Sequence, residues 1–140
     1  MKLSLAISWE LGSERGDSVY LSNDFEGVIL KSIYISELTN GDFDITIAPL
    51  IKAWGFSGGT RKDSINVDSL MNYVGYKGLV ASRPGPMLDK FALPKGYQID
   101  VNAIAQGYTV DIVSNFFRNA NVHNYMIEIG GEVRCKGTNI

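Results

Sequence analysis

Two aspartates, Asp42 and Asp44, are separated by a single residue in a segment where polar and apolar residues alternate. Residues 42–47 follow a period of two, which is typical of a short, half-buried strand. On such a strand both carboxylates would point to the same face. Paired carboxylates on one face can bind a cation or accept hydrogen bonds from a polar ligand. Alternatively, they cap the strand and meet solvent, because Asp is common at turns.

A second candidate segment covers residues 100–108, where a predicted strand runs directly into a predicted helix. The first turn of a helix carries unpaired backbone N–H groups that can receive a phosphate. Gly107 would allow a ligand to approach this turn closely. The alternative is that Asp100 or Asn102 only caps the helix and that Gly107 packs against a neighbouring element.

Two further pairs of side chains could contact a ligand. Trp54 and Phe56 flank a glycine and could stack on an aromatic ring, although large aromatic side chains after a short helix are also common in cores. Glu128 and Glu132 bracket a two-glycine turn that would bring both carboxylates to one end of a hairpin. The alternative for this pair is a solvated hairpin tip.

Composition excludes several classes of function. Cys135 and His123 are the only residues of their types, so an internal disulfide, a cysteine-based zinc cluster and a histidine-rich metal site are excluded. Any metal bound by this chain must be held by oxygen atoms. The chain has 13 basic and 15 acidic residues, and this balance lacks the positive surface that nucleic-acid binding requires.

Apolar periodicity and turn residues predict an interleaving of helices and strands. Helices are predicted over 23–40, 49–54, 68–73 and 103–119, and strands over 42–47, 79–82, 87–93, 97–101, 125–129 and 132–136. Gly130–Gly131 between the last two strands is typical of a β-hairpin turn. The interleaving predicts an α+β fold with mixed α/β layers. Because no repeat or linker marks a boundary, residues 1–140 are predicted to form a single domain.

Three blocks of this sequence resemble one known family. Residues 41–50 and 54–56 resemble "GAFDxTxxPLxxxWGF" of the FAD:protein FMN transferases, the ApbE family. Residues 100–111 resemble the family's "DLSxIAKGYAVD", and residues 128–132 resemble its "EIGGE". The blocks occur in the family's order within residues 23–137. The resemblance implies an ApbE-like flavin transferase fold.

The resemblance also implies an activity, which is the Mg²⁺-dependent transfer of FMN from FAD to a Thr or Ser hydroxyl of a partner protein. Implied acceptors are subunits of Na⁺-pumping NADH:quinone reductase or of Rnf-type complexes. Two alternatives stay open: a Mg²⁺-dependent FAD pyrophosphatase and a non-catalytic flavin-binding or interaction module. Family members are usually exported lipoproteins, which implies the bacterial periplasm or the outer face of the inner membrane, although residues 1–7 are too short for a complete signal peptide.

Site residues follow from the resemblance only at matched positions, and no catalytic residue is assigned. The residues implied to contact FAD are Asp42, Phe43, Asp44, Asp100 and Gln106. The backbone carbonyl of Ala103 is implied to be a Mg²⁺ ligand. Gln106 stands where the family commonly has Lys, which implies one positive charge fewer near the pyrophosphate.

The end of the sequence leads to a further expectation. The predicted hairpin stops near residue 140 with an uncovered sheet edge, before the family's downstream His-Ile-Ile-Asp-Pro segment and its late metal-binding Asp/Thr pair. We therefore expect the front portion of an ApbE-like catalytic domain with an incomplete metal shell. The isolated 140-residue chain is expected to be inactive and to self-associate through residues 123–137.

Overall fold

The computed structural model describes residues 11–12, 18–20, 23–56, 59–61, 63–81 and 90–138. The chain divides into two compact units, Met1–Val101 and Asn102–Ile140, and each unit is described by itself. The single domain expected over 1–140 stays a prediction. No helix within the described ranges is long and apolar enough to cross a membrane.

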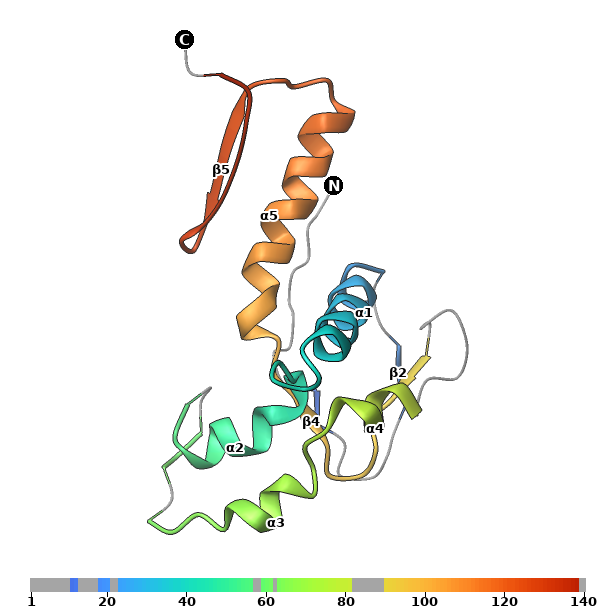
Figure 1. Ribbon diagram of the computed structural model, residues 1–140, viewed down its shortest axis with the longest axis vertical. Coiled ribbons are helices and arrows are strands. Elements are labelled where there is room, and N and C mark those ends of the chain that lie inside the picture. Colours follow the sequence, from blue (N-terminus) through green and yellow to red (C-terminus); the bar gives the residue numbers. More distant parts are fainter. Residues whose placement is uncertain are drawn as a thin grey trace. The chain divides into compact units, whose positions relative to one another are not determined.

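Both units contain helices and short strands (Figure 1). In the first unit the elements are β1 (Leu11–Gly12), β2 (Ser18–Tyr20), α1 (Asn23–Leu38), the 3₁₀ helix η1 (Ile45–Ile47), α2 (Ala48–Ala53), α3 (Val67–Met71), α4 (Tyr76–Ala81), β3 (Lys90–Ala92) and β4 (Gln98–Ile99). The second unit contains α5 (Asn102–Asn119), β5 (Tyr125–Ile129) and β6 (Glu132–Lys136). Within the described ranges the strands form three antiparallel pairs, β1 with β4, β2 with β3, and β5 with β6. This mixture confirms the predicted α+β class.

The core of the first unit forms around one face of α1 and the short elements that follow it. Its buried apolar side chains are Val28, Ile29, Ile33, Ile45, Ala48, Ala53, Leu79, Leu93, Ile99 and Val101. Helix α1 ends where the sequence predicts, because Gly41 takes a φ of +94° and its N–H donates to the carbonyl of Ser36. This ending places residues 42–44 directly after the helix.

The first unit also differs from the prediction. Residues 79–81 belong to helix α4, so the strand expected over 79–82 is wrong for the described part. Strand 87–93 is confirmed over Lys90–Ala92, and residues 82–89 lie outside the described ranges. Strands β1 and β2 were not predicted, because elements of two or three residues are too short to show a period.

The second unit agrees closely with the prediction. Helix α5 and both strands of the hairpin have nearly the expected bounds, and the hairpin runs alongside the helix (Figure 1). Gly130 and Gly131 both have positive φ angles, 59° and 94°, as a type I′ turn requires. Ile127 is buried, whereas its neighbour Met126 is 70% exposed, so the hairpin has one packed face and one open face.

Candidate functional site

The segment that carries the paired aspartates is not a strand. Residues 45–47 form η1, and Asp44 is the residue that caps its N-terminus. The Oδ1 atom of Asp44 accepts hydrogen bonds from the backbone N–H of Thr46 (2.8 Å) and from its hydroxyl (2.6 Å). Because a side chain that bonds its own backbone competes with strand pairing, the predicted strand over 42–47 is wrong. Asp42 and Asp44 therefore do not share a strand face.

Asp44 and Thr46 also reach the start of α4, which is far away in the sequence. The Oδ2 atom of Asp44 accepts a hydrogen bond from the N–H of Tyr76 (2.7 Å), and the Thr46 hydroxyl accepts one from the N–H of Gly75 (2.7 Å). Thr46 is fully buried and Asp44 is half-buried. We call these four residues the Asp44 junction. Thr46, Gly75 and Tyr76 were not predicted as site residues, and the signal in the sequence that could have indicated the junction is the Asp-x-Thr capping pattern.

Thr39, which follows α1, forms hydrogen bonds with the two residues before Asp44. The hydroxyl of Thr39, in the last turn after α1, accepts a hydrogen bond from the N–H of Phe43 (3.1 Å). The carbonyl of Thr39 accepts one from the N–H of Asp42 (3.2 Å). The side chain of Asp42 is exposed and that of Phe43 is half-buried, so both predicted ligand contacts have surface that a ligand can reach.

Asp100, from the second sequence block, lies beside the first block within the same unit. Its N–H donates to the carbonyl of Ile45 (2.7 Å), and its side chain is 8% exposed. This bond brings Asp44 and Asp100 to neighbouring positions of the backbone. Among the residues that the structure describes, however, no three or more His, Cys, Asp or Glu side chains form a metal-binding group.

In the second unit, the second and third blocks meet at the hairpin turn. A Cβ added at Gly130 would lie 2.5 Å from Nε2 of Gln106, so this side chain rests directly against the turn. The N–H of Gly131 donates to Oε1 of Glu128 (2.7 Å), and both Glu128 and Glu132 are exposed. The solvated hairpin tip is therefore a sound interpretation of the two glutamates, and Gln106 is the predicted site residue that lies beside them.

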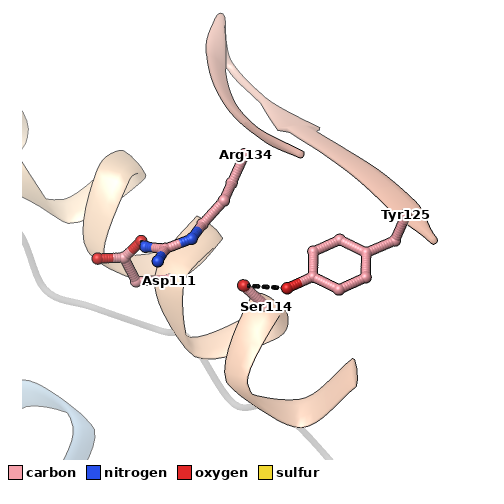
Figure 2. Close-up of polar contacts among 4 residues, drawn as sticks. All are labelled: Asp111, Ser114, Tyr125 and Arg134. Atoms are coloured by element: carbon pink, nitrogen blue, oxygen red, sulfur yellow. Dashed lines mark hydrogen bonds and ion pairs between the residues drawn. The ribbon is translucent and has the colours of Figure 1, made fainter. Parts of the chain in front are cut away.

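The hairpin is held on α5 by polar and aromatic contacts (Figure 2). Figure 2 shows the hydroxyls of Ser114 and Tyr125 facing each other and the Arg134 side chain beside that of Asp111. The two hydroxyl oxygens are 2.7 Å apart, and Arg134 forms an ion pair with Asp111. The ring of Tyr125 also packs edge-on against that of Phe117, with 5.4 Å between ring centroids. These contacts fix the register of the hairpin along the helix.

The start of α5 carries one donor of the kind that Mg²⁺ binds, the backbone carbonyl of Ala103. Ala103 is exposed and lies in the first turn, and a helical carbonyl that accepts one N–H keeps a second lone pair. Carbonyl oxygen is a ligand suited to Mg²⁺, which also keeps several waters. Ala103 could therefore hold the ion as the resemblance implies.

The aromatic pair that follows α2 is open to solvent. The side chains of Trp54 and Phe56 are 49% and 67% exposed. This exposure rules out the interpretation that both belong to the core, and stacking on an aromatic ring stays a prediction.

Comparison with known proteins finds relatives in the same family that the three blocks resemble. The FAD:protein FMN transferase of Vibrio cholerae is 36% identical over 116 residues, which cover 80% of this chain and 34% of that protein. The enzyme of the same name from Haemophilus influenzae is 34% identical over 128 residues, covering 87% of this chain and 36% of the relative. The chain thus spans about a third of the length of these curated relatives.

Solved structures show the same relationship. The flavin transferase ApbE from Vibrio cholerae superposes with a TM-score of 0.72 at 30% identity, covering 91% of this chain and 41% of that one. The flavinyl transferase ApbE of Pseudomonas stutzeri, in its apo form, gives a TM-score of 0.75 at 27% identity, with coverage of 91% and 42%. These matches confirm the predicted flavin transferase fold. The model of the ApbE family matches residues 9–140, and the chain therefore belongs to the ApbE family.

Proposed function

We propose that this chain forms the front part of an enzyme that transfers FMN from FAD to a Thr or Ser hydroxyl of a partner protein, with Mg²⁺ as cofactor. The observation that carries the proposal is the family match over residues 9–140, together with relatives named FAD:protein FMN transferase. The positions of the three sequence blocks support it, because each block includes an ordered turn or a helix start that carries exposed residues.

The residues proposed to contact FAD follow from the family resemblance. Phe43, whose side chain is half-buried, and Asp42, whose side chain is exposed, are proposed to contact FAD, and so is the buried Asp100. By the family resemblance, Gln106 is also proposed to contact FAD, and the N-terminal end of a helix such as α5 favours negative charge. Mg²⁺ held by the carbonyl of Ala103 would neutralise charge on the pyrophosphate.

The reaction is a phosphoryl transfer that conserves atoms without an oxidant or reductant. The acceptor hydroxyl oxygen forms a bond to the FMN phosphorus, the bond between this phosphorus and the bridging oxygen breaks, and AMP leaves. The hydroxyl proton goes to solvent or to a base outside the described residues. By family resemblance, we further propose subunits of Na⁺-pumping NADH:quinone reductase or Rnf-type complexes as acceptors and the periplasmic side of the membrane as the location.

A transfer assay tests the proposal. The protein, in the longest form that its gene encodes, is incubated with FAD, Mg²⁺ and a Thr-containing acceptor peptide, and the products are analysed by mass spectrometry. We expect a peptide that gains one FMN less one water, and no gain with EDTA or with an acceptor carrying Ala in place of Thr. Free FMN and AMP without modified peptide would instead identify a pyrophosphatase, and no product at all would refute both activities.

A further inference from the structure

The hydrogen-bonding capacity of the Asp44 carboxylate is largely used inside the chain. From the residues that the structure describes, it accepts three hydrogen bonds: two at Oδ1 from Thr46 and one at Oδ2 from Tyr76. An ionised carboxylate has about four acceptor positions. The two oxygens thereby cap the starts of two helices, η1 and α4. Little of this carboxylate is left for a direct contact with a ligand.

The hydroxyl of Thr46 links Asp44 to Gly75, because it both donates and accepts a hydrogen bond. It donates to Oδ1 of Asp44 and accepts from the N–H of Gly75, 29 positions away in the sequence. The residue has no exposed surface, so water cannot replace either bond. A valine of the same shape would leave the Gly75 N–H and one Asp44 acceptor position unpaired, whereas serine would keep both bonds.

Tyr76 contacts both Asp44 and the segment that precedes it. Its N–H binds Asp44, and its ring lies beside Gly41, where an added Cβ would be 3.5 Å from Cε1. On the opposite side, Thr39 binds the N–H groups of Asp42 and Phe43. The Asp42–Phe43 dipeptide is thus fixed at both ends while its side chains keep accessible surface.

From this geometry we infer that Asp44 and Thr46 are positioning residues: through the backbone of Gly75 and Tyr76 they hold Asp42 and Phe43 in the conformation that binds FAD. The inference rests on the proposed function, because FAD is the ligand that the segment is proposed to bind. Thr46 is buried and cannot contact a ligand, yet according to this inference its substitution changes the affinity for FAD. The effect of Asp44 on that affinity is likewise indirect.

Two substitutions distinguish positioning from direct contact. Thr46→Val removes the hydroxyl but leaves the carboxylate of Asp44 in the protein. Asp44→Asn replaces one acceptor oxygen by an NH₂ group, which would face an N–H or O–H donor. If Asp44 acted by touching FAD, only Asp44→Asn would weaken binding strongly. If it acts through the junction, both substitutions should weaken binding, and the double variant should be no weaker than the worse single one, because the residues act as one unit.

The experiment titrates FAD into the longest form of the protein that its gene encodes, with Mg²⁺ present, and follows flavin fluorescence. We expect Thr46→Val and Asp44→Asn each to raise the Kd roughly tenfold, the factor that corresponds to about one lost hydrogen bond. Thr46→Ser should stay within about twofold of wild type by the same argument. Thr109→Val is the matched control, because the hydroxyl of Thr109 bonds only the carbonyl of Ala105 one turn earlier among the contacts described.

Amide hydrogen exchange at Gly75 and Tyr76, measured without FAD, gives a readout that does not depend on the proposed function. Both amides should exchange faster in Thr46→Val and Asp44→Asn, and at the wild-type rate in Thr109→Val. Wild-type protein that binds no FAD would refute the proposed function and the inference with it. Wild-type protein that binds FAD, with Thr46→Val binding equally tightly although its Gly75 amide exchanges faster, would overturn the inference alone.

Discussion

The Asp44 junction and the α5–hairpin pair hold their residues in place by different means. The junction joins residues 29 and 32 positions apart through hydrogen bonds between side chains and backbone, around two very short helices. The second unit is a helix followed directly by a hairpin, and its elements pack on their neighbours in sequence. The junction therefore depends on a few hydrogen bonds between distant segments, whereas the second unit is held by several contacts between elements that are neighbours in the sequence.

The largest effect is expected from the apolar support of the junction. Ile45→Ala should lower the free energy of unfolding by about 2–5 kcal/mol, because Ile45 is 2% exposed and its truncation leaves a cavity beside Asp44. Ile47→Ala on the same 3₁₀ helix is the matched control, since Ile47 is 40% exposed and should cost far less. Urea denaturation of the two variants measures the difference. Equal losses would show that the junction does not depend on this buried side chain.

A smaller effect is expected at the contact between α5 and the hairpin. Ser114→Ala removes the partner of the Tyr125 hydroxyl and should cost about 1–2 kcal/mol, because Ser114 is only 1% exposed. Tyr125→Phe in the Ser114→Ala background should recover part of this loss, since no unpaired hydroxyl then remains. A double-mutant cycle by urea denaturation checks the coupling, and strictly additive losses would be inconsistent with a direct bond.

A positive charge introduced at position 106 tests whether the hairpin turn is a binding surface. Gln106→Lys should tighten FAD binding roughly threefold at low salt, because it places a positive charge beside the hairpin turn where the pyrophosphate is proposed to lie. The gain should shrink at high salt. Fluorescence titration at two NaCl concentrations measures it, with Gln106→Met as the uncharged control. Equal affinities for the two variants would argue against pyrophosphate at this position.

The smallest effect is expected for the ion pair between Asp111 and Arg134. Their side chains are 54% and 47% exposed, so solvent screens the attraction. Asp111→Asn should change the free energy of unfolding by about 0–1 kcal/mol, less at high salt than at low salt. Denaturation at both salt concentrations checks this. A loss as large as that of Ser114→Ala would mean that the pair, and not the buried hydroxyl contact, fixes the hairpin register.

The same contrast explains how much of the fold could be predicted. The hairpin bounds follow from alternating residues around Gly130–Gly131, and α5 follows from apolar residues spaced by four. Residues 42–47 alternate equally well, but Asp44 and Thr46 bond the backbone and form a helical turn instead. Helix α4 begins where Asp44 caps Tyr76, and a cap supplied from so far away leaves no local signal.

The predicted site residues stay a prediction, whereas the residues that hold them in place were not predicted. The resemblance of the three blocks implies Asp42, Phe43, Asp44, Asp100 and Gln106 as site candidates, and the structure places them at turns and near helix starts. Thr46 was not predicted as a site residue, because its role arises from bonds to Gly75 that are absent from any pattern along the chain. Hydrogen bonds between segments that are distant in the sequence leave no periodic pattern from which they could be predicted.

The most direct test of the account is a chimera in which residues 9–140 replace the matching third of the Vibrio cholerae FAD:protein FMN transferase. The chimera is given FAD, Mg²⁺ and a Thr-containing acceptor peptide, with the unaltered Vibrio protein as the positive control. We predict FMN transfer to the peptide by the chimera, and weaker transfer when it carries Thr46→Val. A chimera that is folded by circular dichroism and melts cooperatively, yet transfers no FMN, would contradict the claim that this chain serves as the front part of a flavin transferase.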